Sequence, residues 1–507
     1  MAGAERQPLG RSDAVRRHFL IVAFGIQSHI NPCRVLARRL AQLQDEDGSG
    51  PVLATLSVPL FTHRRMFPSS GSGVKLEEEE EAADSTVSYV PYSDGFDDGT
   101  TAKDADGRAR IRRASSQSLS AVVARLAARG RPVTCIVCSL ILPCVLDVAR
   151  EHAIPMAVFW IQPATVLAAH YNYFHGYGEL IASHAADPTY EVALPGLCRT
   201  LRIRDFPSFY VDTTGGEVTK FVIEMFREQF EFMEAQGQSA NKYLVNTFDE
   251  LEPAALAAVR QHLDVFAVGP VLGSSAEARI HLFDHASADR ERYMDWLGAQ
   301  PEKSVVYVSF GSISTYVKQQ IEEIVHGLRR CGRPYLFVVR KDGRQEDVSR
   351  CLDDAVQEGQ GLVVEWCDQP AVLSHPSVGC FVTHCGWNST VEAMALGVPV
   401  VAAPSMFDQP TNAYLIEEEW AGGVRGERNG EGVFTGAELA RCVEMVMGSD
   451  ARAVEIRERV EALKGMARRA TASGGPAERS LRSFVKACRK DSMSPTMSES
   501  ILSKEEI

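Results

Sequence analysis

The chain has 507 residues, a formal net charge of −13 at pH 7 and a sequence pI of about 5.6. The acidic balance, without an extended basic patch, argues against nucleic acid and anionic membrane surfaces as partners. No run approaches the roughly 18 apolar residues of a membrane-spanning helix, and the apolar run 19–24 is too short for a secretory signal. We therefore expect a cytoplasmic protein without a membrane span.

Strand and helix patterns alternate along the chain, which favours a doubly wound α/β fold. The first predicted strand is HFLIVAF, residues 18–24, and the first helical pattern is CRVLARRLAQL, residues 33–43. Further strands are predicted for VSYV, CIVCSLI, MAVFW and KYLVNTF, which begin at Val87, Cys135, Met156 and Lys242. A second series of strands begins with SVVYVSFGS at Ser304.

The length allows two or three domains, and we expect two because α/β domains are often large. The Gly/Pro/Ser stretch that begins at residue 268 marks the expected boundary. We expect a flexible N-terminus over 1–17, an N-terminal domain over 18–267, a linker over 268–290, a C-terminal domain over 291–475, a helix over 476–490 and a disordered tail over 491–507. The tracts 75–85 and 342–358 are predicted surface insertions.

The 12 cysteines are scattered singly along the chain. Cys135 and Cys138 form one CxxC pair, and no second pair follows at the spacing of a zinc site. Reduced core cysteines are therefore favoured over a metal site, as is usual in the cytosol.

A first chemical clue follows the first strand, where GIQSHINP spans 25–32. We expect His29 in a strand-to-helix loop, with Asn31 and Pro32 opening the helix. A histidine at the carboxyl end of a strand can take a proton from a hydroxyl group, which contributes typically about 10² to 10⁴ in rate. Taken alone, this position is more typical of a surface histidine.

The densest clue is the segment 366–409. Its run GCFVTH, residues 379–384, predicts a buried strand that leads into a tight loop. Ser389 and Glu392 then match a capping box, which predicts a helix that begins at Ser389. The start of such a helix stabilises an anion such as a diphosphate. On its own, a capping box indicates only the start of a helix and not a binding site.

A second predicted strand, VPVVAA over 398–403, is followed by Asp408 and Gln409. In open α/β sheets, ligands bind outside the carboxyl ends of the strands. The loop, the helix start and these two side chains are therefore expected to converge. Trp366 stands at the beginning of the segment, where the alternative to a ligand contact is a buried core tryptophan.

The segment 366–409 resembles the plant secondary-product glycosyltransferase box of the UDP-dependent glycosyltransferases, because many positions match at fixed spacing without a gap. The resemblance implies a GT-B fold, in which two Rossmann-like doubly wound domains face each other across a cleft. It also implies that the N-terminal domain binds the acceptor, that the C-terminal domain binds the UDP-sugar, and that neither a metal nor another cofactor is required.

The same resemblance assigns donor-binding roles to individual residues. Trp366 would stack on uracil, and Gln369 and Glu392 would contact the ribose. The diphosphate contacts are expected from His384, Asn388 and Ser389, the sugar contacts from Asp408 and Gln409, and further donor contacts from Ser312, Cys367 and the backbone of Trp387. Glucose is expected because Gln409 closes the box, although Phe407 stands where the family usually has tryptophan.

GIQSHINP is similar to the family motif PxxGHxNP, which implies that His29 is the general base. In many members an aspartate orients this histidine, but Ser139 occupies that position here. Gln27, Leu142 and Phe209 are candidates for the acceptor pocket. Four further stretches, 91–99, 160–174, 194–209 and 245–253, are similar to the branch of anthocyanin 5-O-glucosyltransferases and glucose-ester-forming enzymes, in which a hydroxyl residue often replaces the aspartate.

The resemblance thus implies an inverting glucosyltransferase that joins glucose from UDP-glucose to a hydroxyl or carboxyl group of a small plant acceptor. Apart from these two substrates no partner is expected, and the protein is expected to be a monomer. A Rossmann oxidoreductase is disfavoured because the first loop lacks GxGxxG. A metal-dependent transferase built on the acids of DGFDDG, residues 94–99, is disfavoured because that stretch is typical of a Gly-rich loop. A catalytically weak UDP-sugar-binding scaffold or sensor stays open because of Ser139 and Phe407.

Overall fold

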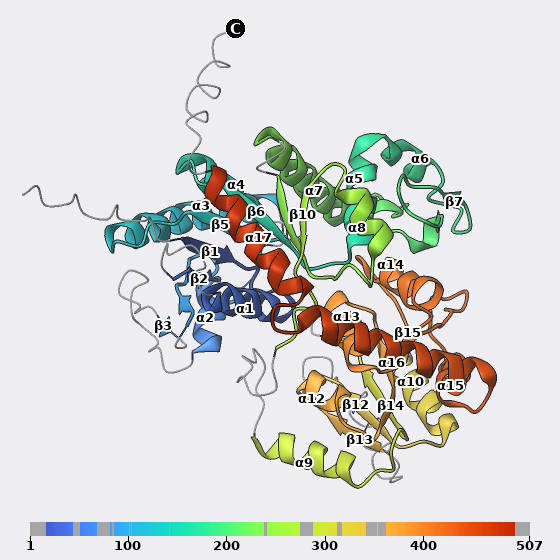
Figure 1. Ribbon diagram of the computed structural model, residues 1–507. Coiled ribbons are helices and arrows are strands. Elements are labelled where there is room, and N and C mark those ends of the chain that lie inside the picture. The colour runs from blue at the N-terminus through green and yellow to red at the C-terminus, as the bar shows by residue number, and fades with distance from the viewer. Residues whose placement is uncertain are drawn as a thin grey trace, which may run out of the picture.

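A computed structural model describes residues 17–43, 51–67, 82–83, 86–100, 102, 104–140, 142–237, 241–273, 287–311, 317–340, 352 and 361–491. The described chain forms two α/β domains, each built on its own twisted sheet with helices on both faces (Figure 1). The predicted insertions 75–85 and 342–358, apart from residues 82–83 and 352, lie outside the described residues, as do the two chain ends and Ser312.

The N-terminal sheet orders its eight described strands as β10-β9-β6-β5-β1-β2-β4-β3, and every neighbouring pair is parallel except β3 with β4. Its strands are β1 (His18–Val22), β2 (Leu53–Ser57), β3 (Ala82–Ala83), β4 (Ser88–Tyr89), β5 (Cys135–Ser139), β6 (Met156–Trp160), β9 (Lys242–Val245) and β10 (Asp264–Ala267). All residues of β1, β5 and β6 are buried. Continuous apolar strands of this kind are what a parallel sheet covered by helices on both faces requires.

The helices of this domain are α1 (Gln27–Gln42), α2 (Leu60–Met66), α3 (Ala105–Ala128), α4 (Pro143–Glu151), α5 (Ala164–Asn172), α6 (Gly178–Ser183), α7 (Glu217–Ala235) and α8 (Pro253–Val259). Between α5 and α7 the chain forms the helical turn η1 (Tyr173–Tyr177), a hairpin of β7 (Glu191–Val192) with β8 (Leu201–Arg202), and the turns η2 (Ile203–Asp205) and η3 (Ser208–Tyr210).

The C-terminal sheet orders its six described strands as β13-β12-β11-β14-β15-β16, all parallel. They are β11 (Val305–Ser309), β12 (Tyr335–Val338), β13 (Gly361–Val364), β14 (Val378–Thr383), β15 (Val400–Ala402) and β16 (Gly423–Arg425). The helical elements are α9 (Ser287–Gly298), α10 (Lys318–Cys331), α12 (Gln369–Leu373), α13 (Trp387–Leu396), α14 (Gln409–Tyr414), η5 (Leu415–Glu419), α15 (Gly436–Met447), α16 (Ala451–Thr471) and α17 (Pro476–Asp491).

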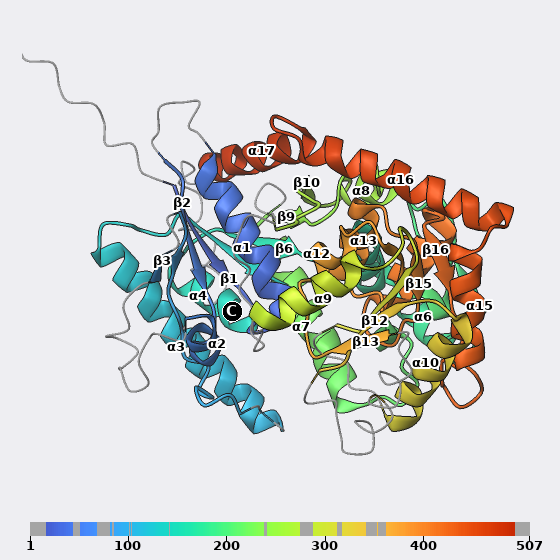
Figure 2. The same cartoon turned by 90° about the horizontal axis from the view of Figure 1, so that it is seen from below.

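The last helix, α17, returns to the N-terminal domain. α16 and α17 follow one another along one side of both domains (Figure 2). The ring of Phe484 on α17 lies 5.6 Å from the ring of Phe19 on β1 and 5.5 Å from the ring of Phe266 on β10. All three rings are buried, so burial of apolar surface holds α17 against the first sheet.

Three expectations about element boundaries are wrong. α1 begins at Gln27, so His29 lies in the first turn of a helix and not in a loop, and Pro32 lies inside that helix. α13 begins at Trp387 behind Gly386, which has no side chain to cap it, so the predicted capping box does not form. α9 begins at Ser287, inside the predicted linker 268–290.

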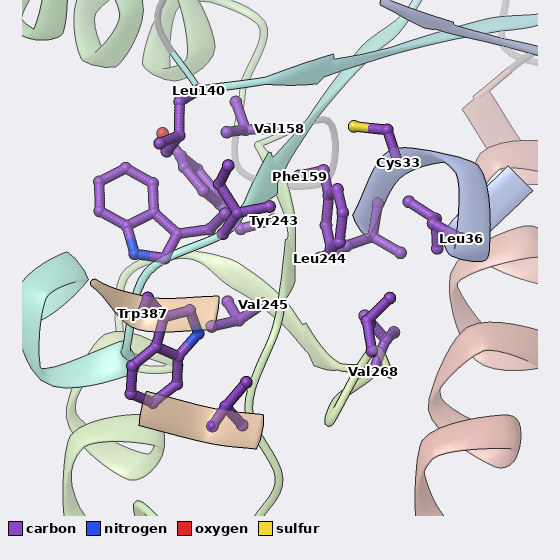
Figure 3. Packing of buried hydrophobic residues seen from close by; sticks show 14 of the residues in the cluster. Cys33, Leu36, Leu140, Val158, Phe159, Tyr243, Leu244, Val245, Val268 and Trp387 are labelled. Atoms are coloured by element: carbon purple, nitrogen blue, oxygen red, sulfur yellow. The ribbon is translucent and has the colours of Figure 1, made fainter. Parts of the chain in front are cut away.

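Trp387 lies where the two domains meet. Its ring is 3% exposed and packs against the N-terminal domain close to Val245 (Figure 3). The indole Nε1–H donates a hydrogen bond of 2.9 Å to the carbonyl of Asn246, which directly follows β9. Because both the apolar body and the polar tip of this side chain are satisfied across the boundary, it holds the start of α13 against the first domain.

Candidate active site

A cavity of about 560 Å³ lies between the two domains. Its walls come from the segments that follow the carboxyl ends of β1, β5 and β6 in one domain and of β11, β13, β14 and β15 in the other. Parallel strands bring their carboxyl ends to one edge of each sheet, and those edges are where open α/β sheets bind ligands. The two edges face the same cavity.

His29 lines this cavity, and Ser139 lies behind it at the end of β5. The Nδ1 of His29 is 3.2 Å from the Oγ of Ser139, which also accepts the backbone N–H of Phe24 at 3.2 Å. Ser139 is completely buried and does not line the cavity itself. The serine therefore fixes the histidine from behind and leaves the Nε2 side of the ring available to a ligand.

Burial lowers the pKa of His29 to about 4, although its hydrogen bond with Ser139 acts in the opposite direction. The imidazole is therefore neutral at pH 7 and can accept a proton. No carboxylate contacts His29 among the described hydrogen bonds and ion pairs, so a positive charge formed on the ring has a hydroxyl dipole beside it and no counter-ion.

Trp366, Cys367 and Gln369 line the opposite side of the cavity, at the exit of β13 and the start of α12. The Nε2 of Gln369 donates to the Oγ of Ser389 at 3.0 Å and to a carboxylate oxygen of Glu392 at 2.9 Å. The hydroxyl of Tyr307 donates to the Oε1 of Gln369 at 3.3 Å. The two residues of the expected capping box are thus joined through Gln369 at the cavity wall.

His384 follows β14 and lies between two glycines that line the cavity. A Cβ added to Gly311 would lie 2.6 Å from its Cε1, and one added to Gly386 would lie 2.6 Å from its Nε2. Only residues without a side chain fit on either side of this ring. Burial lowers the pKa of His384 to about 4, so at neutral pH it offers a neutral N–H to a ligand.

Asn388, in the first turn of α13, crosses to the other domain. Its Nδ2 donates a hydrogen bond of 2.7 Å to the carbonyl of Ser28 in the first turn of α1. The starts of α1 and α13 therefore face each other across the cavity, with His29 on one and Ser389 on the other. Both helix starts present their positive dipole ends near the same space.

Asp408 and Gln409 line the cavity at the start of α14. Asp408 accepts the Nδ2–H of Asn412 at 2.7 Å, and burial raises its pKa to about 6 against the effect of that hydrogen bond. The Oε1 of Gln409 accepts the backbone N–H groups of Ser405 at 2.9 Å and Met406 at 3.0 Å. A carboxylate acceptor and an amide donor are the pair that sugar hydroxyls require.

Two of the three predicted acceptor residues line the cavity, and one does not. Gln27 and Phe209 line the cavity, whereas Leu142 does not: it caps the start of α4 and is buried in the core. Leu140, with a left-handed φ of 51°, lines the cavity in its place. No sequence motif marks the cavity-lining residues that follow β6 or lie on α7, such as Gln162 and Met225, so they were not predicted.

Within the described ranges, no group of three or more His, Cys, Asp or Glu side chains is placed to hold a metal ion. No helix in those ranges is long and apolar enough to cross a membrane.

Two Rossmann-like domains that enclose a site of this composition define a two-domain nucleotide-sugar transferase. Residues 220–453 match the family described as UDP-glucoronosyl and UDP-glucosyl transferase. The chain is 38% identical over 483 residues to a chloroplastic crocetin glucosyltransferase of Gardenia jasminoides, covering 93% of this chain and 97% of the relative. It is 37% identical over 485 residues to anthocyanidin 3-O-glucoside 5-O-glucosyltransferase of Verbena hybrida, covering 93% and 98%.

The crystal structure of Os79 from O. sativa in complex with UDP superimposes with a TM-score of 0.74 at 28% identity, covering 93% of this chain and 100% of the other. The chain therefore belongs to the UDP-dependent glycosyltransferases of plants. It has their GT-B fold and is a UDP-glucosyltransferase.

Proposed function

We propose that the protein transfers glucose from UDP-glucose, with inversion at the anomeric carbon, to a hydroxyl or carboxyl group of a small phenolic, flavonoid or hormone-like acid. The acceptor oxygen forms the new bond to the anomeric carbon while the bond to UDP breaks. Where the acceptor is a hydroxyl, its proton passes to the Nε2 of His29. The observation that carries this proposal is the neutral His29, held by Ser139 and facing the same cavity as Asp408.

The donor fits the C-terminal half of the cavity. The face of Trp366 suits the uracil base, since stacking on an aromatic ring contributes about 1 to 3 kcal/mol. Glu392, already oriented by Gln369, suits the ribose diol. The neutral His384 and the start of α13 suit the diphosphate, and no metal is needed there. Asp408 and Gln409 suit the hydroxyls of the sugar.

The acceptor class follows from Ser139. A general base with a pKa of about 4 and no carboxylate partner is weak. A carboxylic acid, with a reference pKa of about 4, is already ionised at pH 7, whereas a phenol, with a reference pKa of about 10, is not. The site therefore favours carboxylates and acidic phenols. The name of the Verbena relative, anthocyanidin 3-O-glucoside 5-O-glucosyltransferase, supports the hydroxyl part of this acceptor class.

We further propose that the protein works as a monomer in the cytoplasm. The described cysteines are all free, and most of them are buried, which fits a reducing compartment. The Gardenia relative carries the word chloroplastic in its name, so imaging of the tagged full chain is the test that separates the two compartments.

The alternative is a donor-binding sensor, which is suggested by the missing carboxylate at Ser139 and by Phe407, which is 38% exposed. One assay tests the proposed reaction against this alternative. UDP release from UDP-glucose is measured with a panel of flavonoids, phenolic acids and hormone acids. We expect acceptor-dependent UDP release and a glucoside or glucose ester as product. Binding of UDP-glucose without turnover on any acceptor would favour the sensor.

A further inference from the structure

One wall of the cavity is apolar except at a single position. This acceptor wall consists of the cavity-lining residues that follow β5 and β6 or lie on η3 and α7. It presents aliphatic and aromatic side chains such as Leu140, Ile161, Phe209 and Met225. Among its described residues, Gln162 alone carries a polar side chain.

Gln162 leaves the first sheet at the same edge as Ser139, the partner of His29. β5 and β6 are neighbouring parallel strands, and Ser139 pairs with Phe159 in their register. Gln162 follows three residues after Phe159, so it leaves the same sheet edge from which Ser139 holds His29. An acceptor whose reacting oxygen contacts His29 can therefore extend its body along the wall that contains Gln162.

The amide of Gln162 is not satisfied by the protein. Its Oε1 is enclosed and has no hydrogen-bond partner among the described residues. An enclosed polar atom without a partner costs about 1 to 3 kcal/mol, whereas an apolar side chain of the same size would fill the wall without that cost. Because Gln162 lines the cavity, a ligand bound there can supply the partner that the protein does not.

We propose that Gln162 binds a hydroxyl group of the acceptor that is remote from the reacting oxygen. A hydroxyl can donate to the Oε1 and accept from the Nε2 of the amide, so it pairs with either end of the group. The acceptor class is thereby narrowed to molecules with an apolar or aromatic body and at least two oxygen functions, one for transfer and one for Gln162. This inference rests on the proposed function.

Sites built to bind a substrate hydroxyl reject analogues that lack it, because their own polar group is then left unpaired. The test compares 4-hydroxycinnamic acid with cinnamic acid, counting only the glucose ester, and 7,4′-dihydroxyflavone with 7-hydroxyflavone, counting only the 7-O-glucoside. Wild-type protein is expected to prefer the member with the second hydroxyl at least about tenfold in kcat/KM in the pair it accepts.

Gln162→Leu should bring that ratio to within about twofold of unity and leave KM for UDP-glucose unchanged. It should not lower the thermal unfolding midpoint, since it removes an unsatisfied buried amide. Gln229→Leu is the matched control: Gln229 is 2% exposed on α7, its Nε2 is also enclosed without a partner, and it does not line the cavity. This variant should keep the wild-type ratio.

The outcomes separate the two proposals. An acceptor ratio that is the same in wild type and Gln162→Leu overturns the role of Gln162 while the transfer reaction stands. If Gln162→Leu lowers kcat/KM equally for both members of a pair, Gln162 has a structural role, and its proposed role in binding the acceptor is overturned as well. A third outcome is that wild-type protein binds UDP-glucose but transfers glucose neither to the four acceptors nor to any compound of the wider panel. In that case the proposed function fails, and this inference fails with it.

Discussion

Ser208 and Phe407 join the two domains by a reciprocal pair of hydrogen bonds. The N–H of Ser208 donates to the carbonyl of Phe407 at 2.8 Å, and the N–H of Phe407 donates to the Oγ of Ser208 at 2.8 Å. Phe407 adopts a left-handed φ of 59°, which costs a non-glycine residue about 1 to 2 kcal/mol. The next residues along the chain, Phe209 and Asp408, both line the cavity, so this pair fixes the position of one cavity wall relative to the other.

Ser208→Ala removes the hydroxyl that accepts the Phe407 N–H and leaves the other bond in place. We expect kcat to fall about two- to tenfold, which corresponds to one hydrogen bond, and the ratio of UDP-glucose hydrolysis to transfer to rise as the sugar loses its fixed position relative to the acceptor. Both rates are measured from UDP release with and without acceptor.

Thr411→Val is the control for this variant. It also removes an interdomain hydrogen bond, from the Thr411 Oγ1 to the Asp205 carbonyl at 2.7 Å, but neither residue lines the cavity. We expect lower stability with an unchanged hydrolysis-to-transfer ratio. If the two variants change this ratio equally, the effect belongs to domain contact in general and not to the Ser208–Phe407 pair.

Asp408→Asn should make the protein more stable and less active. Burial raises the folded-state pKa of Asp408 from 3.8 to about 6, so the folded state holds a proton that the unfolded state releases at lower pH. Stability is therefore lost as pH rises from about 4 to about 6, by at most about 3 kcal/mol. The asparagine avoids this loss, and thermal unfolding should show a larger gain at pH 8 than at pH 5.

The same substitution should change the pH profile of kcat/KM for UDP-glucose. His29 stays neutral down to about pH 4, so a fall in activity near pH 6 would report protonation of Asp408. We expect this limb in wild type and its disappearance in Asp408→Asn, whose residual activity stays flat to lower pH. A limb near pH 6 that persists in the variant would exclude Asp408 as its source.

Ser139→Asp should strengthen His29 as a base. A carboxylate can accept both the Phe24 N–H and the His29 Nδ1–H that now meet the serine hydroxyl, and it would raise the pKa of His29 and stabilise the imidazolium. We expect transfer to a phenol of pKa about 10 to rise roughly tenfold and ester formation to change little. Ser139→Ala, compared at equal folded fraction, should slow phenol transfer. A uniform change on both acceptors would contradict this role for position 139.

Trp366→Leu should weaken UDP binding by about 1 to 3 kcal/mol, or roughly 5- to 150-fold in Kd, because the base loses its stacking surface. Isothermal titration with UDP measures this change. Trp296→Leu serves as a matched control, since that tryptophan is partly buried on α9 outside the cavity. Equal UDP affinity in wild type and Trp366→Leu would show that the uracil base does not stack on Trp366.

The predicted donor residues between Trp366 and Gln409 all line the cavity, because one segment of the sequence supplies them. The residues from Trp366 to Gln409 follow β13, β14 and β15 at the carboxyl ends of one sheet, so a single stretch of chain supplies most of this cavity wall. The predicted start of α13 was wrong for a physical reason. Ser389 and Glu392 pair with Gln369 from another element, and local pattern does not reveal a partner 20 residues away.

The acceptor half was predicted poorly because it is assembled from distant segments. Leu140 rather than Leu142 reaches the cavity since the left-handed backbone at Leu140 turns the chain after β5, and nothing in the sequence marks that turn. The Ser208–Phe407 pair joins positions 199 residues apart. Contacts of this kind depend on how two domains pack, which hydrophobic periodicity does not encode.

We propose that His29 serves as the base for hydroxyl acceptors and that carboxylate acceptors need it far less. The most direct test is kcat/KM with UDP-glucose for wild type and His29→Ala on one phenol and one carboxylic acid. We predict a fall of about 10² to 10⁴ for the phenol and of less than about tenfold for glucose ester formation. Equal loss of both reactions would contradict the claim.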